Sequence, residues 1–236
     1  MNRHRELLDL SRQVKHYLDY LQGLGVNNLP LVRHVPPPDS FLESFKETLD
    51  DIRNDLGECF RCELSGARKR IVFGEGHSRA DLMFVGGAPS EDDEWEGDPF
   101  TGKAGQVLTD IIVKGIEMRR EDCYLTTLVK CRPPEDRDPH QPEIRTCRPF
   151  LFRQISSIRP KVICILGQTA AQGLLGRRES LPKLRHRFHD LSGIPVMPTF
   201  HPAYLLEYPE KRREVWEDIK MIIRYLGDTH RPEESS

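Results

Sequence analysis

The sequence predicts an α/β domain in which a parallel sheet is covered by helices on both faces. Four short apolar runs rich in strand-forming residues lie at 82–85, 124–129, 162–166 and 195–200. Helical stretches separate or follow them at about 104–117, 142–158, 168–175 and 211–226. Strands that are apolar nearly throughout and alternate with helices are typical of a sheet buried on both sides. The expected fold is a three-layer αβα domain with a four-stranded parallel sheet.

The first 56 residues have a different pattern. Leucine and aromatic residues recur at helical spacing between Leu7 and Leu21, and prolines follow at 36–38. A second helix is predicted at about 40–56, and we expect the extension to pack on the domain or on a partner. The predicted organisation is a helical extension with a Pro-rich linker, an α/β domain and a polar tail, at residues 1–56, 57–228 and 229–236.

The composition is that of a folded protein. Hydrophobic residues make up 37% of the chain, which is enough to fill a core. The formal net charge of -2 lacks the basic excess usual in DNA-binding proteins. No apolar run follows a basic start and none is long enough to span a bilayer, so we expect neither a signal peptide nor a membrane segment. We therefore expect a cytoplasmic monomer with reduced cysteines.

Four cysteines have the spacing of a metal site. Cys59 and Cys62 form a C-x-x-C before the first strand, Cys131 ends the second strand, and Cys147 lies in the helix that follows. Four thiolates suit either tetrahedral zinc or an iron–sulfur cluster. One C-x-x-C with two separated cysteines is commoner in cluster proteins, so zinc is the second choice, and four unrelated buried thiols are the third. Cys164 lies inside an apolar run and is expected in the core.

In a parallel sheet, ligands bind beyond the carboxyl ends of the strands. The run Gly86-Gly87-Ala88-Pro89-Ser90 follows the first strand, and its small residues allow a ligand to approach the backbone. Phe100 precedes a helix and is placed to stack on a planar ring, although most phenylalanines pack in a core. His201 follows the last strand and precedes Pro202, which makes it a candidate acid–base or electrophilic residue, although a lone histidine is more often structural.

Basic residues gather in two places on the loop side of the predicted sheet. One group precedes the last strand, and its members are Arg177, Arg178, Lys183, Arg185, His186 and Arg187. The other follows the second strand, and its members are Lys130, Arg132, Arg137, Arg145 and Arg148. Charge runs usually mark a solvated face, but this position on the ligand side favours contact with nucleic acid.

Taken together, these segments resemble the iron–sulfur uracil-DNA glycosylases of family 4. The resemblance runs from about Cys59 to Leu226. It rests on Cys59-x-x-Cys62, Gly86 to Ser90, Pro99-Phe100-x-Gly102-x-Ala104-Gly105-Gln106, Val129-Lys130-Cys131-Arg132-Pro133-Pro134, Cys147 and His201-Pro202-Ala203-Tyr204-Leu205-Leu206. So many short motifs in the same order make a chance match improbable.

The resemblance implies a DNA-repair enzyme that hydrolyses the N-glycosidic bond of uracil in DNA after flipping the base. It implies a structural [4Fe–4S] cluster on Cys59, Cys62, Cys131 and Cys147. The expected partner is uracil-containing DNA, single- or double-stranded.

The resemblance also assigns roles to single residues. Phe100 would stack on uracil, and His201 would donate to uracil O2 as the base departs, with the two rings on opposite sides of a slot sized for a pyrimidine. Leu205 would wedge into the duplex. The remaining expected base-binding positions are Gly86 and Thr127, the catalytic loop positions are Gly87 and Ala88, and the further DNA contacts are Arg185, Arg187 and Lys130.

Two positions depart from the family pattern. Gly87 stands where the family usually has the glutamate that positions the attacking water, and a glycine has no side chain to do so. Thr127 stands where the family usually has an asparagine that reads the edge of uracil. Losing such a two-ended contact costs roughly 1–3 kcal/mol of base discrimination.

Three hypotheses follow from these departures. The enzyme releases uracil with another group orienting the water, for which the nearby candidates are Asp92, Asp93 and Ser90. Alternatively, it prefers another deaminated or damaged base. In the third hypothesis, the protein is a binding module that recognises uracil or DNA without cutting.

Overall fold

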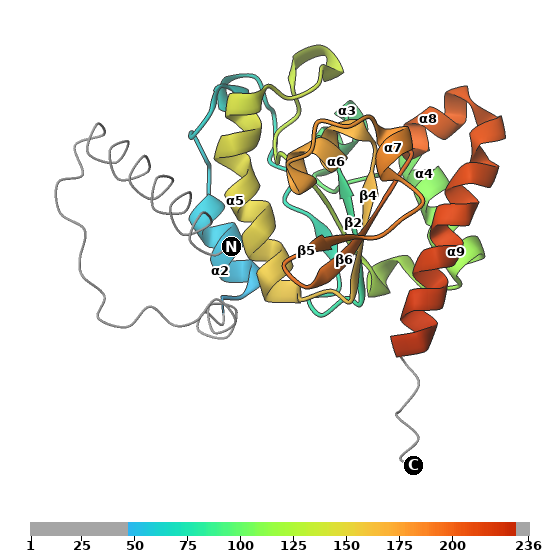
Figure 1. The fold of residues 1–236 in the computed structure, drawn as a ribbon. Coiled ribbons are helices and arrows are strands. Elements are labelled where there is room, and N and C mark those ends of the chain that lie inside the picture. Colours follow the sequence, from blue (N-terminus) through green and yellow to red (C-terminus); the bar gives the residue numbers. More distant parts are fainter. Residues whose placement is uncertain (1–46, 230–236) are drawn as a thin grey trace, which may run out of the picture. The chain divides into compact units, whose positions relative to one another are not determined.

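The computed structural model describes residues 47–229, and these form a three-layer domain (Figure 1). The predicted helix between Leu7 and Leu21, the Pro-rich linker and nearly all of the polar tail lie outside the described residues. Of the second predicted helix, the described part is α2, Leu49–Leu56. Its first turn is fixed by Thr48, whose side chain accepts a hydrogen bond from the Asp51 amide while Asp51 caps the Thr48 amide in return.

The sheet has six strands in the order β1-β3-β2-β4-β6-β5. Their bounds are Glu75–Gly76 for β1, Leu82–Gly86 for β2, Tyr124–Thr127 for β3, Val162–Leu166 for β4, His189–Leu191 for β5 and Ile194–Thr199 for β6. The four central strands are parallel, as predicted. The edge strands β1 and β5 pair antiparallel with β3 and β6 and were not predicted, because two or three residues are too few to give a periodic pattern.

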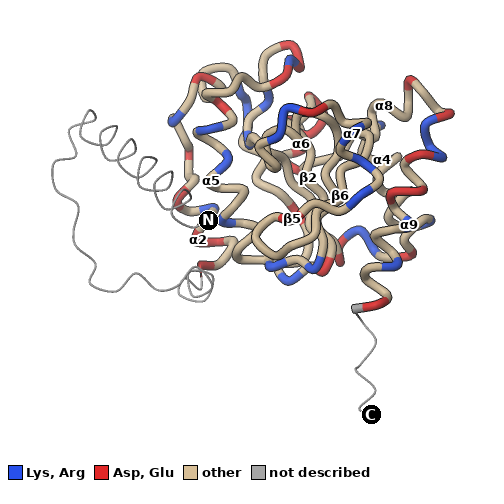
Figure 2. The backbone as a smooth tube through the Cα atoms, in the orientation of Figure 1, with Lys and Arg blue, Asp and Glu red and all other residues tan. Residues whose placement is uncertain are grey.

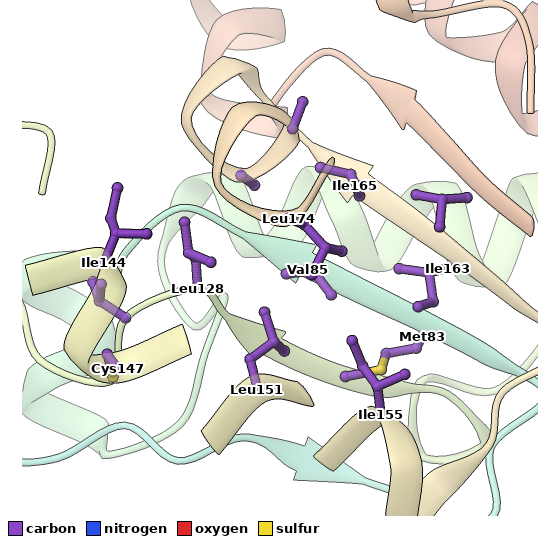
Figure 3. Close-up of a cluster of buried hydrophobic side chains, with 14 of the residues drawn as sticks. Met83, Val85, Leu128, Ile144, Cys147, Leu151, Ile155, Ile163, Ile165 and Leu174 are labelled. Atoms are coloured by element: carbon purple, nitrogen blue, oxygen red, sulfur yellow. The ribbon is translucent and has the colours of Figure 1, made fainter. Parts of the chain in front are cut away.

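Helices cover both faces of this sheet (Figure 1). The side chains of α5 and α6, Gln141–Ile158 and Gln168–Leu175, pack with Met83, Val85, Ile163 and Ile165 on one face. Figure 3 shows this buried cluster. The side chains of α4 and α9, Lys103–Asp110 and Arg212–Thr229, pack with the alternate residues Leu82, Phe84 and Cys164 on the other face. The alternation of side chains along each strand therefore confirms the predicted layers, and Cys164 lies in the core as predicted.

Shorter elements complete the domain. The helices α3, α7 and α8 are Glu91–Glu96, Leu181–Leu184 and Pro202–Glu207. The predicted helix at 104–117 is divided, since α4 passes into a π-helical turn at Ile111–Ile116 that ends at Glu117 with φ 63°. The 3₁₀ turns are Glu63–Gly66, Arg120–Asp122, Pro134–Asp136 and Pro209–Lys211.

Within residues 47–229, no helix combines the length and the apolar character that crossing a bilayer demands.

Candidate active site

The loops that follow the parallel strands enclose a cleft of about 370 Å³. The loop after β2 contributes Gly87, Ala88 and Ser90, the segment after β4 contributes Thr169, and the residues after β6 contribute His201. The loop between β3 and α5 closes the remaining side with Pro133 and 136–139. The cleft therefore lies where the carboxyl ends of parallel strands meet, as the sequence predicted.

His201 is held in one orientation by the start of α8. Its Nδ1 accepts a hydrogen bond from the Ala203 amide at 3.2 Å, and Pro202 is the first residue of the helix. Burial lowers the pKa of His201 to about 4, although the Asp93 carboxylate opposes this shift. At neutral pH the imidazole is therefore uncharged, and its proton lies on Nε2 because Nδ1 is the acceptor. The geometry gives the cleft a neutral hydrogen-bond donor.

Gly167 allows His201 to come this close to the end of β4. Its φ is 93°, and a Cβ atom there would lie 3.2 Å from Cβ of His201. A larger residue would meet both backbone strain and contact with the histidine.

Phe100 is placed by a strained backbone and by two glycines. It has φ 58°, which is unusual for a residue with a bulky side chain. A Cβ on Gly105 would lie 1.7 Å from the Phe100 carbonyl oxygen, and a Cβ on Gly86 would lie 2.8 Å from Cζ of Phe100. Both glycines are therefore required by the close approach of Phe100, and the predicted position Gly86 supports this ring directly.

Two polar side chains hold the Phe100 loop: Asp93, which the sequence offered as a candidate for orienting water, and Arg120, which it did not single out. The Asp93 carboxylate accepts hydrogen bonds from the amide and the hydroxyl of Thr101 at 2.8 and 3.0 Å. The Arg120 guanidinium donates to the carbonyl oxygens of Pro99 and Phe100 at 2.9 and 3.1 Å. An arginine next to a short strand carries no sequence signal for this role.

Phe100 and His201 are direct neighbours. Their ring centroids are 6.0 Å apart and the rings are tilted by 34°. Aromatic rings in contact are typically separated by about 4.5–7 Å, so no base fits between these two rings. The expected open slot between them is therefore wrong for this structure: Phe100 is 6% exposed, while His201 lines the cleft.

Thr127 lies close to Phe100 but is 2% exposed. Its methyl carbon is 3.6 Å from where a Cβ of Gly86 would lie, and its hydroxyl donates to the Val129 carbonyl at 2.8 Å. The hydroxyl proton is thus donated within the turn after β3. Towards a base, the Thr127 hydroxyl can act only as a hydrogen-bond acceptor.

The three candidates for orienting water have different positions. Ser90 lines the cleft, but it also caps α3 through the Asp93 amide. Asp93 is 5% exposed, and its carboxylate oxygens accept hydrogen bonds from the amides of Ser90 and Thr101. Asp92 points toward the glycine at 102, where a Cβ would lie 2.0 Å from its Oδ2. Neither carboxylate lines the cleft, so the expectation for Asp92 and Asp93 is wrong.

A different acid lines the cleft instead. The Thr169 hydroxyl donates to Oδ1 of Asp138 at 2.6 Å, and both residues line the cleft together with His201. A Cβ on Gly87 would lie 3.3 Å from Cβ of Thr169. Asp138 was missed from the sequence because it stands in a loop of mixed charge, without a motif of its own.

Three of the four expected DNA contacts are buried. Lys130 is 0% exposed, and its amine donates to Oγ1 of Thr126 and to the carbonyl of Thr127 at 2.5 and 2.8 Å. The Arg185 side chain is 8% exposed and pairs with Asp218 at 2.8 Å. Leu205 is 1% exposed and packs in the core. These three predictions are wrong, because Lys130, Arg185 and Leu205 make their contacts inside the protein and are not available to DNA.

Other side chains that could contact DNA are exposed. Arg187 is exposed, so its predicted DNA contact stays a prediction. Leu206 and Tyr208, at the end of α8, are each 44% exposed. Figure 2 shows Lys and Arg interleaved with Asp and Glu over most of the described chain. Arg132 and Arg137, for example, pair with Asp136 and Glu143.

Of the four cysteines of the predicted metal site, Cys131 and Cys147 are buried and Cys59 and Cys62 are partly buried. Burial raises the pKa of the Cys131 thiol to about 12, with smaller contributions from Cys147 and Cys62 and an opposing one from Arg68. Burial likewise raises the pKa of Cys147, and Cys62 and Cys59 add to it. Two N–H groups point at sulfur, from the Lys130 amide to Cys147 at 3.3 Å and from Arg68 to Cys131 at 3.6 Å.

These thiols are not arranged around a single ion. Among the described residues, no three His, Cys, Asp or Glu side chains are close enough together to hold one metal ion.

Comparison with known proteins gives one consistent family. Residues 73–220 match the model of the uracil DNA glycosylase superfamily. The type-4 uracil-DNA glycosylase of Saccharolobus solfataricus is 42% identical over 189 residues, which cover 77% of this chain and 88% of the relative. The type-4 uracil-DNA glycosylase of Thermotoga maritima is 40% identical over 185 residues, covering 77% of this chain and 96% of the relative. The type-4 uracil-DNA glycosylase of Archaeoglobus fulgidus is 36% identical over 189 residues, which cover 77% of this chain and 94% of the relative. The chain therefore belongs to the uracil DNA glycosylase superfamily.

Proposed function

We propose that this protein removes uracil from DNA by hydrolysing the N-glycosidic bond between the base and deoxyribose. Family membership and the names of its relatives support this reaction. The observation that carries the proposal is the neutral, oriented His201 at the cleft.

The leaving base accumulates negative charge as the glycosidic bond breaks. A donor fixed at the oxygen that receives this charge stabilises the transition state more than the ground state. The Nε2 hydrogen of His201 provides such a donor. Loss of one such donor typically costs about 10²–10³ in rate.

The target base must leave the duplex before it reaches this cleft. In our proposal the exposed Leu206 fills the vacated space, because Leu205 is buried in the core. Arg187 contacts a phosphate, and Phe100 supports the wall of the base site next to Gly86. We propose that the protein acts as a monomer on single- or double-stranded DNA.

A second candidate function follows from Gly87. Because this position has no side chain to hold water, a protein that binds uracil or another deaminated base without cutting is the alternative. Incubation with oligonucleotides that carry uracil, hypoxanthine or xanthine, scored for abasic sites, separates the two. We expect abasic sites at uracil with the wild-type protein and about 10²–10³-fold slower formation with His201→Ala, which removes the donor. Tight binding without abasic sites would establish the alternative.

We further propose that Cys59, Cys62, Cys131 and Cys147 bind a [4Fe–4S] cluster. The spacing of the four cysteines supports this, as do the two N–H groups that point at the sulfur atoms of Cys131 and Cys147. When bound, the cluster is structural and ties the segment before β1 to the end of β3 and to α5. We expect iron and acid-labile sulfide in equal amounts, visible absorbance, and loss of both with Cys147→Ser. A colourless protein that contains zinc would contradict the cluster.

A further inference from the structure

The wall of the cleft opposite Gly87 carries an acid paired with a hydroxyl. Thr169 belongs to the first turn of α6, and Asp138 lies in the loop between β3 and α5, so the topology brings them together from distant parts of the chain. Oγ1 of Thr169 donates a hydrogen bond of 2.6 Å to Oδ1 of Asp138. This bond orients the carboxylate within the cleft that His201 also lines.

The same wall faces the missing side chain at residue 87. A Cβ on Gly87 would lie 3.3 Å from Cβ and 3.5 Å from Cγ2 of Thr169. Any side chain at 87 would therefore start in contact with Thr169, whose hydroxyl is bound to Asp138. The absence of that side chain leaves the acidic pair open to the cleft.

Asp138 differs from the other carboxylate in this wall. Asp136 is bound by the Arg132 guanidinium through two hydrogen bonds of 2.7 and 2.9 Å, and this lowers the pKa of Asp136. A carboxylate held by a cation is a weak base. The nearby Arg137 directs its guanidinium to Glu143 and to the backbone carbonyl of Asp138, not to the Asp138 carboxylate. Among the described residues, the Asp138 carboxylate is thus bound by the Thr169 hydroxyl and by no guanidinium group.

We propose that Asp138, oriented by Thr169, binds the attacking water and accepts its proton. This inference rests on the proposed uracil-DNA glycosylase function. The water oxygen forms a bond to C1′ of deoxyribose while the bond from C1′ to N1 of uracil breaks. The electron pair of the broken bond leaves with the base. One water proton passes to the Asp138 carboxylate, and the uracil anion is held by the Nε2 hydrogen of His201. The anion and the carboxyl group then exchange protons with solvent.

The test is the single-turnover rate of uracil release with enzyme in excess, measured together with the Kd for the same oligonucleotide. Asp138→Asn keeps the acceptor for Thr169 but removes the base, and we expect a rate lower by on the order of 10²-fold with the Kd within about twofold. Asp138→Glu keeps a carboxylate and should retain more of the rate than Asp138→Asn. Glu135→Gln is the matched control, since it removes a negative charge from the same loop outside the cleft.

A rescue variant tests the position directly. In the Asp138→Asn background, Gly87→Glu combined with Thr169→Ala places a carboxylate at residue 87 and clears the space that it needs. We expect the rate to rise again at least tenfold. If the unchanged chain releases uracil and Asp138→Asn releases it at the same rate, this inference is overturned while the proposed function stands. If the unchanged chain releases no uracil, both fall.

Discussion

The backbone amide of Ala203 donates a hydrogen bond to Nδ1 of His201 across 3.2 Å. This single contact decides where the imidazole proton lies. It occurs because His201 caps α8 and the following proline fixes the first turn of that helix. The sequence His201-Pro202-Ala203 therefore encodes the tautomer as well as the position of the proposed electrophile.

The stability of the protein should depend on pH through His201. Its pKa is lowered to about 4 by burial, whereas an unfolded histidine titrates near 6.5. Between these values the unfolded chain binds a proton that the folded chain does not, so the free energy of unfolding falls as the pH decreases from 7 to 4. Urea unfolding at several pH values should show that the free energy of unfolding decreases less between pH 7 and 4 for His201→Gln than for the wild-type protein. Equal pH dependence of the two proteins would contradict the lowered pKa.

Gly105→Ala should destabilise the domain and displace Phe100. The new Cβ would lie 1.7 Å from the Phe100 carbonyl, so the loop has to move. We expect a loss of about 2–4 kcal/mol in the free energy of unfolding, comparable with other cases of overpacking and backbone strain. Thermal unfolding measures it, and Gly66→Ala is the control because no atom lies within 4 Å of a Cβ there. Similar unfolding temperatures for the two variants would refute the close approach.

Alanine substitutions of Arg185 and Arg187 should differ, the first affecting stability and the second DNA binding. Arg185 compensates the buried Asp218, so Arg185→Ala is expected to cost about 3–5 kcal/mol of stability. Arg187 is exposed, and Arg187→Ala should instead lower the slope of log Kd for DNA against log salt concentration by about 0.7–0.9. Unfolding experiments and salt titrations on both variants test this difference. A reversed pattern would restore Arg185 as the DNA contact.

Leu206→Ala should slow uracil release from double-stranded DNA more than from single-stranded DNA. Only the duplex leaves a gap when the base is flipped, and the exposed Leu206 is the side chain proposed to fill it. We expect about a tenfold loss on the duplex and less than twofold on the single strand, since filling the gap offsets a few kcal/mol of unstacking. Equal losses on both substrates would exclude a wedge role.

The parallel strands and the position of the cleft could be predicted from the sequence. The four parallel strands are each read from an apolar run such as Val162–Leu166, which the structure reproduces residue for residue. His201 and Gly87 were predicted at the cleft because both follow strands, and the carboxyl ends of parallel strands meet.

Burial of polar side chains could not be predicted in this way. Lys130 and Arg185 look like surface cations in the sequence, yet each finds internal partners that are distant along the chain or in the backbone. The pair of Asp138 and Thr169 is separated by 31 positions, so only the fold reveals that they touch. Leu205 and Leu206 are chemically identical, and the position of α8 on the core decides which one is exposed.

The role of His201 as the donor to the leaving base is tested most directly by the release of free uracil from a uracil-containing oligonucleotide, compared between the wild-type protein and His201→Ala under single-turnover conditions. We expect rapid release by the wild-type protein and a rate lower by a factor of about 10²–10³ for the variant, with similar DNA affinity. Equal rates for the two proteins, or no uracil released by either, would contradict this role.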